Sequence, residues 1–173
     1  MAIKRILTYP DPVLRQKVEP VTSFDESLRE LARDLAETMY AAPGAGLAAN
    51  QIGVCLRVVV IDVSASKEEQ KPLVLVNPEI IEKEGCLSEE EGCLSVIDYT
   101  AKVERFSRLL VRAQDLHGKT WEFPAENFFA RVIQHELDHL DGILFIDRIS
   151  SLKRTIYKKR LKKLLRDREE STS

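Results

Sequence analysis

The stretch Gln134-His135-Glu136-Leu137-Asp138-His139 lies within an apolar run at helical spacing, residues 128–140, and we expect a helix there. Residues four apart share one face of a helix, so His135 and His139 point the same way, with Glu136 beside them. This is the H-E-x-x-H arrangement, in which two imidazoles bind a divalent metal next to a carboxylate. The alternative is a buried helix with two incidental histidines. It is disfavoured because the chain has only three histidines and two of them lie here.

A catalytic metal centre of this kind needs a third protein ligand, with the fourth position left to water. The long metalloprotease motif would place a third histidine at position 145, which is Phe145, so that class is excluded. A downstream glutamate could be the third ligand only at Glu169 or Glu170, which lie in a frayed, highly charged tail. His117 lies in a predicted hairpin turn, where a histidine is usually solvated. The third ligand is therefore expected to be a cysteine, which as a thiolate binds borderline and soft metals.

Two of the three cysteines belong to a local duplication: Glu84-Gly85-Cys86-Leu87-Ser88 recurs as Glu91-Gly92-Cys93-Leu94-Ser95. Spacing alone does not choose between Cys86 and Cys93 as the metal ligand, and either would otherwise be a small buried hydrophobe. An odd, small number of cysteines argues against a disulfide framework. It favours a reducing cytoplasm, in which thiols stay available as ligands.

The composition is that of a soluble globular protein. The 173 residues, of which 44% are hydrophobic and 31% charged, are enough for one domain with its own core. No apolar stretch reaches the length of a membrane span, and residues 1–20 lack the apolar centre of a signal peptide. We therefore expect a cytoplasmic protein with no membrane association.

Turn and periodicity signals place further elements around the predicted metal-binding helix. Ser23-Phe24-Asp25-Glu26 has the capping-box pattern with Ser23 as N-cap, which predicts a helix over residues 24–41. Asn77-Pro78 is expected to end a short strand. Apolar runs predict strands, which cover residues 56–63, 73–76, 109–111 and 121–123, with a turn at 115–119 between the last two.

A second unusual segment is Gly44-Ala45-Gly46-Leu47-Ala48-Ala49-Asn50-Gln51. Its glycines allow a close approach of the backbone to another group, but it lacks the Lys-Ser/Thr ending of a phosphate loop. By itself it is read most simply as a small-residue turn packed under a sheet. The alternative is a functional role for Gln51, whose side-chain amide would donate to a carbonyl oxygen as an oxyanion site requires.

The end of the chain differs in charge from the rest. Residues 151–173 contain nine basic and three acidic groups, a net charge of +6, whereas residues 1–150 carry −8. An apolar stripe accompanies this charge and predicts an amphipathic basic helix; it consists of Leu152, Ile156, Leu161, Leu164 and Leu165. We expect the stripe to dock on the domain. The excess positive charge fits an anionic partner such as ribosomal RNA.

Three motifs, taken in order, resemble the signature motifs of the peptide deformylases: Gly44-x-Gly46-Leu47-Ala48-Ala49-x-Gln51, Glu91-Gly92-Cys93-Leu94-Ser95 and Gln134-His135-Glu136-x-x-His139. The likeness covers most of the chain, including Asp11-Pro12-x-Leu14-Arg15 and Gly142. In that family the ligating cysteine precedes the first histidine by about the interval that separates Cys93 from His135. The resemblance therefore selects Cys93, and it leaves Cys86 as an unrelated thiol on the preceding strand-like segment.

This resemblance implies an α+β fold, in which a central metal-binding helix is surrounded by mostly antiparallel β-sheets and a C-terminal α-helix follows. It implies a catalytic domain over residues 1–150 and, as in the bacterial type, a basic helix over 151–173 that docks near the ribosomal exit tunnel. The implied reaction removes the N-formyl group from nascent polypeptides that begin with formyl-methionine, and it releases formate. One divalent metal ion is implied. Iron(II) is the first choice, and zinc, nickel and cobalt are alternatives that this donor set does not separate.

The resemblance also assigns roles to individual residues. Cys93, His135 and His139 would hold the metal, and Glu136 would take a proton from water and pass it to the leaving amine. The side-chain amide of Gln51 and the backbone N–H of Leu94 would stabilise the oxyanion together with the metal. Further residues are expected to bind the substrate, with an apolar pocket for the methionine side chain among them: Gly44, Ala45, Gly46, Glu91, Phe128 and Val132.

Three positions depart from the usual family pattern. Ile97 stands where many members have proline, which changes a turn. Ala45 stands where a branched residue is common, which would widen the pocket. Thr100 stands where some members have an arginine that reaches the substrate, and this puts one substrate contact in doubt.

Two rival classes remain at this point. The first is a different metallohydrolase that cuts internal peptide bonds. The second is a ribosome-binding module whose metal is only structural. A structural site is closed by four protein ligands, and a fourth candidate is hard to find here, which counts against the second class.

Overall fold

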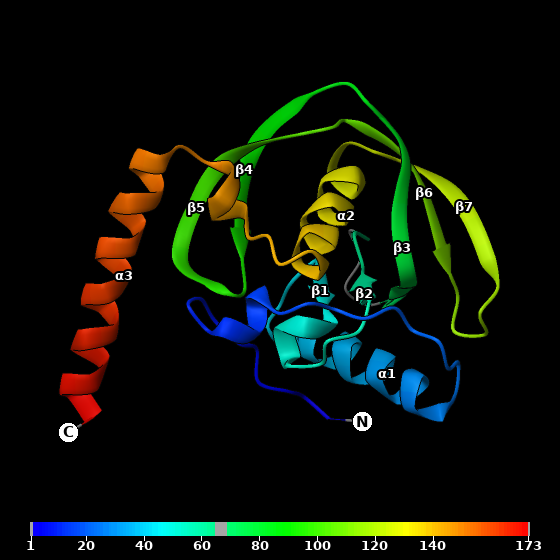
Figure 1. Cartoon of the computed structure of the whole chain (residues 1–173), viewed down its shortest axis with the longest axis horizontal. Helices are drawn as coiled ribbons and strands as arrows, with labels where there is room; N and C mark the ends of the chain where they lie inside the picture. The colour runs from blue at the N-terminus through cyan, green and yellow to red at the C-terminus, as the bar shows by residue number, and fades with distance from the viewer. Residues whose placement is uncertain (1, 65–68, 173) are drawn as a thin grey trace.

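Helix α2 (Asn127–Leu140) lies at the centre of the fold, with antiparallel strands arching over it and helix α1 (Glu26–Ala41) beneath it in the view of Figure 1. The computed structural model describes residues 2–64 and 69–172. The domain expected over residues 1–150 begins at Met1 and the helix expected over 151–173 ends at Ser173, and both of these end residues lie outside the described residues. The α+β class expected from the sequence is confirmed.

Two antiparallel sheets form the β part of the described residues. The larger has the strand order β1–β2–β3–β6–β7, and the smaller consists of β4 and β5. Their bounds are β1 Gly46–Ala48, β2 Val58–Ile61, β3 Leu73–Glu84, β4 Leu87–Cys93, β5 Val96–Arg105, β6 Arg108–Gln114 and β7 Thr120–Glu126. Strand β2 lies between two neighbours and all four of its residues are buried, which explains its uninterrupted apolar sequence.

The buried face of α2 packs against the larger sheet. Ile133 and Leu137 share a core cluster with Val59 of β2 and Leu75 of β3. This packing fixes the rotation of the helix about its axis, so that the two histidines are presented on a different face. The helix ends at Leu140, and Gly142, which follows the C-cap Asp141, takes a φ of 74°, a left-handed conformation that glycine adopts without strain.

Helix α1 was predicted over residues 24–41 with Ser23 as its N-cap, and this start is wrong. The helix begins at Glu26, and Asp25 is the N-cap: its carboxylate accepts a hydrogen bond from the Leu28 N–H at 3.2 Å. A carboxylate at this position satisfies a free backbone N–H and also interacts favourably with the positive end of the helix dipole. The predicted apolar stripe is confirmed, since Leu28, Leu31, Leu35 and Met39 are all buried.

Strand β3 does not end at Asn77-Pro78 as expected but continues to Glu84. Asn77 adopts a φ of 49°, and the pairing with β6 shifts register between Val76 and Glu79. Asparagine tolerates a positive φ, and its side chain is held in place because it exchanges two hydrogen bonds with the backbone of Val21. The irregularity thus accommodates the proline within the strand.

Cys86 lies in the connection between β3 and β4, and its side chain is exposed. The expectation that it sits on a strand is therefore wrong. Gly85 precedes it with a φ of 72°, which turns the chain sharply between the two strands. The acidic stretch that follows forms β4, and it pairs along its length with β5.

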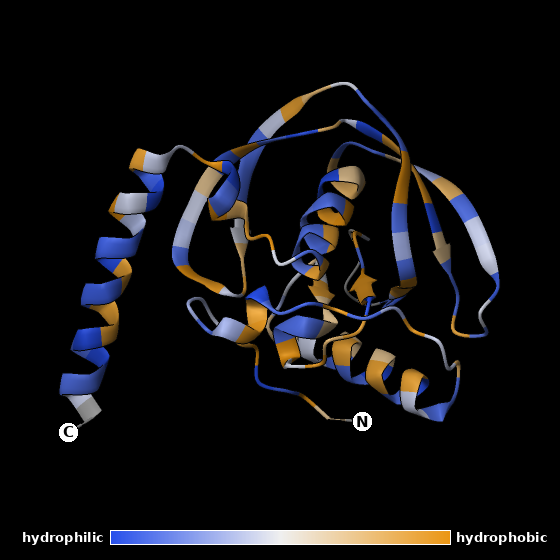
Figure 2. Ribbon diagram, viewed as in Figure 1, coloured by the Kyte–Doolittle hydropathy of each residue, from blue (hydrophilic) through white to orange (hydrophobic). Residues whose placement is uncertain are grey.

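The basic tail forms helix α3 (Ser151–Thr172), as predicted, but its docked face differs from the predicted stripe. Leu152 and Ile156 are 69% and 58% exposed, whereas Tyr157 and Leu161 are buried. At 3.6 residues per turn, Leu152 and Ile156 lie on the opposite side of the helix from Leu161, so one stripe cannot include all three. Figure 2 shows that, beyond its first turns, α3 turns its hydrophobic side toward the rest of the chain.

Tyr157 was missed by the sequence analysis and anchors α3. Its ring stacks on Tyr99 at a centroid distance of 4.7 Å, and its hydroxyl donates to the carbonyl of Ile97 at 3.1 Å. Leu164 and Leu165 are half-buried on the same side of the helix. None of the helices in the described part of the chain is long and apolar enough to cross a membrane.

Candidate metal centre and active site

Cys93, His135 and His139 come together at one point in the structure. Cys93 is the last residue of β4, and the two histidines lie one turn apart on α2. Cys93 Sγ is 3.2 Å from Nε2 of His139, and the Nε2 atoms of the two histidines are 3.3 Å apart. The three ligand atoms all lie within 4.8 Å of one another. Cys93, and not Cys86, therefore faces the histidines.

The spacing of these atoms fits one divalent metal ion. A tetrahedral ion with bonds of about 2.0 Å to nitrogen and about 2.3 Å to sulfur places its ligand atoms about 3.3–3.6 Å apart. The separation of 3.2 Å between Sγ of Cys93 and Nε2 of His139 and that of 3.3 Å between the two Nε2 atoms lie close to this range. A thiolate and two imidazoles form a donor set that transition metals prefer.

Glu136 lies beside this cluster and is almost completely buried. Its Oε1 is 3.9 Å from Nε2 of His135, and its Oε2 is buried without a hydrogen-bond partner in the structure. Burial raises the pKa of Glu136 to about 7, although the nearby charge of His135 acts in the opposite direction. A carboxyl group with this pKa is suited to exchange protons near neutral pH.

Gly46 makes room for Glu136. A Cβ at position 46 would lie 2.9 Å from Cγ and 3.0 Å from Oε1 of Glu136, which is too close for any other residue. Gly44 is similarly tight, since a Cβ there would lie 2.9 Å from Cδ1 of Leu94. The glycine motif is thus a close-packed wall of the metal site.

Gln51 follows β1 in a short 3-10 helix, η2 (Ala49–Ile52), and its side chain is held in one orientation. Its Oε1 accepts from the N–H of Ala48 at 2.9 Å, and its Nε2 donates to Oγ of Ser95 at 3.0 Å. Nε2 also lies 3.8 Å from Sγ of Cys93. The amide N–H₂ group is therefore adjacent to the metal cluster, as an oxyanion donor would need to be.

Glu91 fixes the imidazole of His135, a role that the sequence did not reveal. Its Oε1 accepts from Nδ1 of His135 at 2.9 Å, and both of its oxygens accept from Arg105 at 2.8 Å. Burial alone would raise the pKa of Glu91, but the hydrogen bonds from Arg105 and His135 lower it to about 2. An ionised carboxylate on Nδ1 leaves Nε2 of His135 free to bind a metal.

Both oxygens of Glu91 are thus committed inside the protein. The substrate contact expected for Glu91 stays a prediction, and it would have to be made by the backbone of this residue. Arg105 could not be singled out from the sequence because it is one of 26 basic residues, and nothing local marks it as buried.

A cavity of about 500 Å³ opens beside the metal cluster. The residues expected to bind substrate all line it: Gly44, Ala45, Gly46, Glu91, Phe128 and Val132. Phe128 is 52% exposed and Val132 is buried, so the two side chains lie at different depths. Thr100 also lines the cavity, and so does Arg131, which the sequence analysis did not single out.

The fold and the site together define a metal-dependent hydrolase whose cavity is large enough for the end of a peptide. The family model of the polypeptide deformylases matches residues 3–155. A peptide deformylase from Desulfotalea psychrophila is 52% identical over 164 residues, which cover 94% of this chain and 97% of that protein. The chain belongs to the peptide deformylase family.

Solved structures agree with this assignment. A peptide deformylase from Legionella pneumophila has a TM-score of 0.89 at 46% identity, with 97% of this chain and 98% of that chain covered. A peptide deformylase from Acinetobacter baumannii, solved with Met-Ala-Ser bound, has a TM-score of 0.81 at 34% identity, with 86% and 99% covered. The chain is thus an enzyme that removes the N-formyl group from newly synthesised polypeptides, as the three motifs implied.

Proposed function

We propose that Cys93, His135 and His139 hold one catalytic metal ion and that Glu136 is the acid-base group of the deformylation. A bound divalent metal supplies a Lewis acid that lowers the pKa of a coordinated water. Glu136 would accept a proton from the attacking water and pass it to the leaving amine as formate separates. The observation that carries this proposal is the buried, unpartnered Oε2 of Glu136 beside the three ligand atoms.

Charge that develops on the formyl oxygen is stabilised by two groups of this chain. Nε2 of Gln51 and the backbone N–H of Leu94 are the donors that we assign to it. Hydrogen bonds to Ala48 and Ser95 fix the amide of Gln51 before substrate binds. A donor that is already oriented needs no reorganisation during the reaction, which is the main source of electrostatic catalysis.

The methionine side chain of the substrate occupies the cavity beside the metal. Phe128 and Val132 of α2 form one wall, and Ala45 lies in the glycine motif among the lining residues. The peptide backbone then runs past Gly44, Gly46 and the backbone of Glu91. The relative from Acinetobacter baumannii, solved with a bound peptide that begins with methionine, supports this choice of substrate.

Iron(II) is the native metal in this proposal, with zinc, nickel and cobalt as ions that the same site accepts. A thiolate and two imidazoles suit all four, and the site works in the reducing cytoplasm, where Cys93 is kept out of disulfides and stays available as a ligand. Metal analysis of protein purified without oxygen tests this directly. Iron in a ratio of one per chain is the expected result.

The acid-base role of Glu136 is tested by the Glu136→Gln variant. The amide keeps the shape of the side chain but cannot shuttle a proton, so the variant should bind one metal ion and lose most turnover. Loss of general acid-base catalysis is worth about 10²–10⁴-fold in rate. Cleavage of formyl-Met-Ala by this variant at near the wild-type rate would show that the assignment is wrong.

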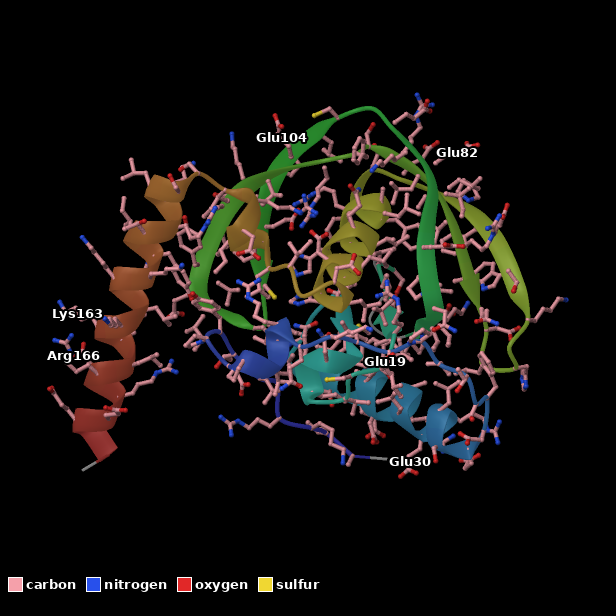
Figure 3. The ribbon with its side chains drawn as sticks, in the orientation of Figure 1. Glu19, Glu30, Glu82, Glu104, Lys163 and Arg166 are labelled. Atoms are coloured by element: carbon pink, nitrogen blue, oxygen red, sulfur yellow. The ribbon has the colours of Figure 1, made fainter. Side chains whose placement is uncertain are left out.

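We further propose that residues 1–150 form the catalytic domain and that the helix over 151–173 docks on the ribosome. Tyr157 and Leu161 are used to hold α3 on the domain, which leaves its outer face free. Figure 3 shows Lys163 and Arg166 on the side of α3 away from the rest of the chain. A basic helical face of this kind fits the phosphates of ribosomal RNA.

A further inference from the structure

Four charged side chains form a continuous series of hydrogen bonds that starts at His135. Glu91 accepts from Nδ1 of His135 at 2.9 Å and from Nε and Nη2 of Arg105, each at 2.8 Å. Nη1 of Arg105 donates to Oδ2 of Asp138 at 2.6 Å. Asp138 in turn accepts from Nε and Nη2 of Arg148, at 2.6 and 2.7 Å.

These residues belong to four different elements: β4, β5, α2 and the 3-10 helix η3 (Phe145–Arg148). The side chains of Arg105, Glu91 and Asp138 are 2%, 6% and 11% exposed, while that of Arg148 is 41% exposed. Charge-assisted hydrogen bonds are strong and directional in a dry interior. The position of the Glu91 carboxylate is therefore set by elements other than its own strand.

The connections of Arg105 have a particular relation to the metal cluster. Glu91 lies two residues before Cys93 on β4, and Asp138 lies one residue before His139 on α2. Arg105 binds both carboxylates and thereby ties the strand that carries the thiolate to the helix that carries the imidazoles.

We propose that Arg105, Asp138 and Arg148 are positioning residues for the metal centre, acting through Glu91 on the orientation of His135. This inference rests on the proposed metal site and extends it to residues outside the cavity. Arg105 holds the two oxygens of Glu91 in the plane that meets Nδ1 of His135. Asp138 holds Arg105, and Arg148 holds Asp138.

The geometry requires a guanidinium at position 105. Its planar fork supplies two parallel N–H groups for Glu91 and a third for Asp138 at the same time. A lysine ammonium is a point charge at the end of a flexible chain and would compensate the charges without fixing their positions. Arg105→Lys therefore separates the positioning role from simple charge neutralisation.

A second cavity of about 500 Å³ gives access to this network from outside the active site. Arg105, Asp138 and Arg148 line it, and it shares no lining residue with the metal cavity. Arg57 lines it as well and pairs with Asp141 just beyond the end of α2, without a bond to Glu91 or Asp138. Arg57→Met is thus a matched control that removes an arginine from the same cavity and the same end of the helix.

The test compares cobalt(II)-loaded wild type with Arg105→Lys, Arg148→Met and Arg57→Met. The visible absorption of cobalt(II) reports ligand geometry, and transfer to a chelator gives the rate of metal release. Partners of ligating histidines are worth about 10- to 100-fold in metal affinity or activity. We expect release from Arg105→Lys to accelerate by a factor in this range, with an altered spectrum. We also expect a fall in kcat at unchanged KM.

Arg148→Met should change release and spectrum in the same direction by a smaller factor, and Arg57→Met should match wild type. Arg148 is partly exposed, so this variant decides the question even if changes at position 105 prevent folding. Wild-type release and spectrum in Arg148→Met would overturn the proposal, whether or not Arg105→Lys folds, as would an equal acceleration in Arg57→Met. Failure of the wild type itself to bind cobalt would instead contradict the metal site.

Discussion

At the scale of single residues, the burial of Glu136 has a consequence for stability as well as for catalysis. The pKa of this carboxyl is raised from 4.5 to about 7, so the folded state holds its proton more tightly than the unfolded chain does. The metal-free protein should therefore lose stability as pH rises from about 4.5 to about 7. A shift of this size corresponds to about 3 kcal/mol above pH 7.

Glu136→Gln removes this cost, because the amide has no charge to bury. We expect the metal-free variant to melt at a higher temperature than metal-free wild type above pH 7, by about 2–4 °C per kcal/mol. The difference should vanish below about pH 4, where the wild-type carboxyl is protonated in both states. Melting curves across this pH range measure it, and a constant difference at all pH values would show that ionisation is not the cause.

The duplicated cysteines allow a second prediction at the same scale. Cys93→Ala removes a ligand atom that lies 3.2 Å from His139, so the variant should lose both metal and deformylase activity. Cys86→Ala changes an exposed side chain between two strands and should leave both nearly intact. Metal content and turnover of the two purified variants decide the matter, and the reverse pattern would assign the ligand to the wrong repeat.

At the scale of elements, one face of helix α3 holds it on the domain, and the opposite face is the one that we propose for ribosome docking. Tyr157 and Leu161 are buried against the domain, and burial of one such side chain contributes about 1.5–3 kcal/mol. Truncation of the helix would therefore destabilise the domain as well as remove its charge. A fall in ribosome binding after truncation would not separate the two effects.

Charge reversal on the outer face separates them. Lys159→Glu, Lys163→Glu and Arg166→Glu alter exposed side chains and leave Tyr157 and Leu161 in place. We expect the triple variant to keep its melting temperature and its rate on short formyl peptides. Its affinity for ribosomes should fall, and the wild-type affinity should decrease steeply with salt. An affinity for ribosomes that changes neither on charge reversal nor with salt concentration would contradict docking by α3.

At the scale of the whole molecule, the parts of the structure that follow a short local rule were predictable. The helical spacing of His135 and His139 and the apolar stripe of α1 are such cases, and both are present. The path of β3 through Asn77 was not predictable, because Asn77 is held by Val21, which is remote in the sequence. Long-range contacts of this kind leave no periodic trace in the chain.

The candidate site, too, was predictable only where its residues follow a local sequence pattern. Three motifs pointed to the metal ligands and to Gln51, because each motif is local. The contacts of Arg105 with Glu91 and Asp138 join residues that are 14 and 33 positions apart, so no spacing rule could indicate them. On α3, the docked face depended on which side of the helix meets Tyr99, and the sequence of the helix alone offered two apolar faces.

The three ligands of the proposed metal site come from two distant parts of the chain, since Cys93 and His139 are 46 positions apart. A bound ion therefore acts as a reversible cross-link. Closing a loop of this size lowers the conformational entropy of the unfolded chain, which raises its free energy by about 4 kcal/mol. Chelation should lower the melting temperature of wild type by several degrees, and zinc should restore it, while Cys93→Ala should respond to neither. A cell that runs short of the ion would then lose this enzyme to proteases, because the empty protein spends more of its time unfolded.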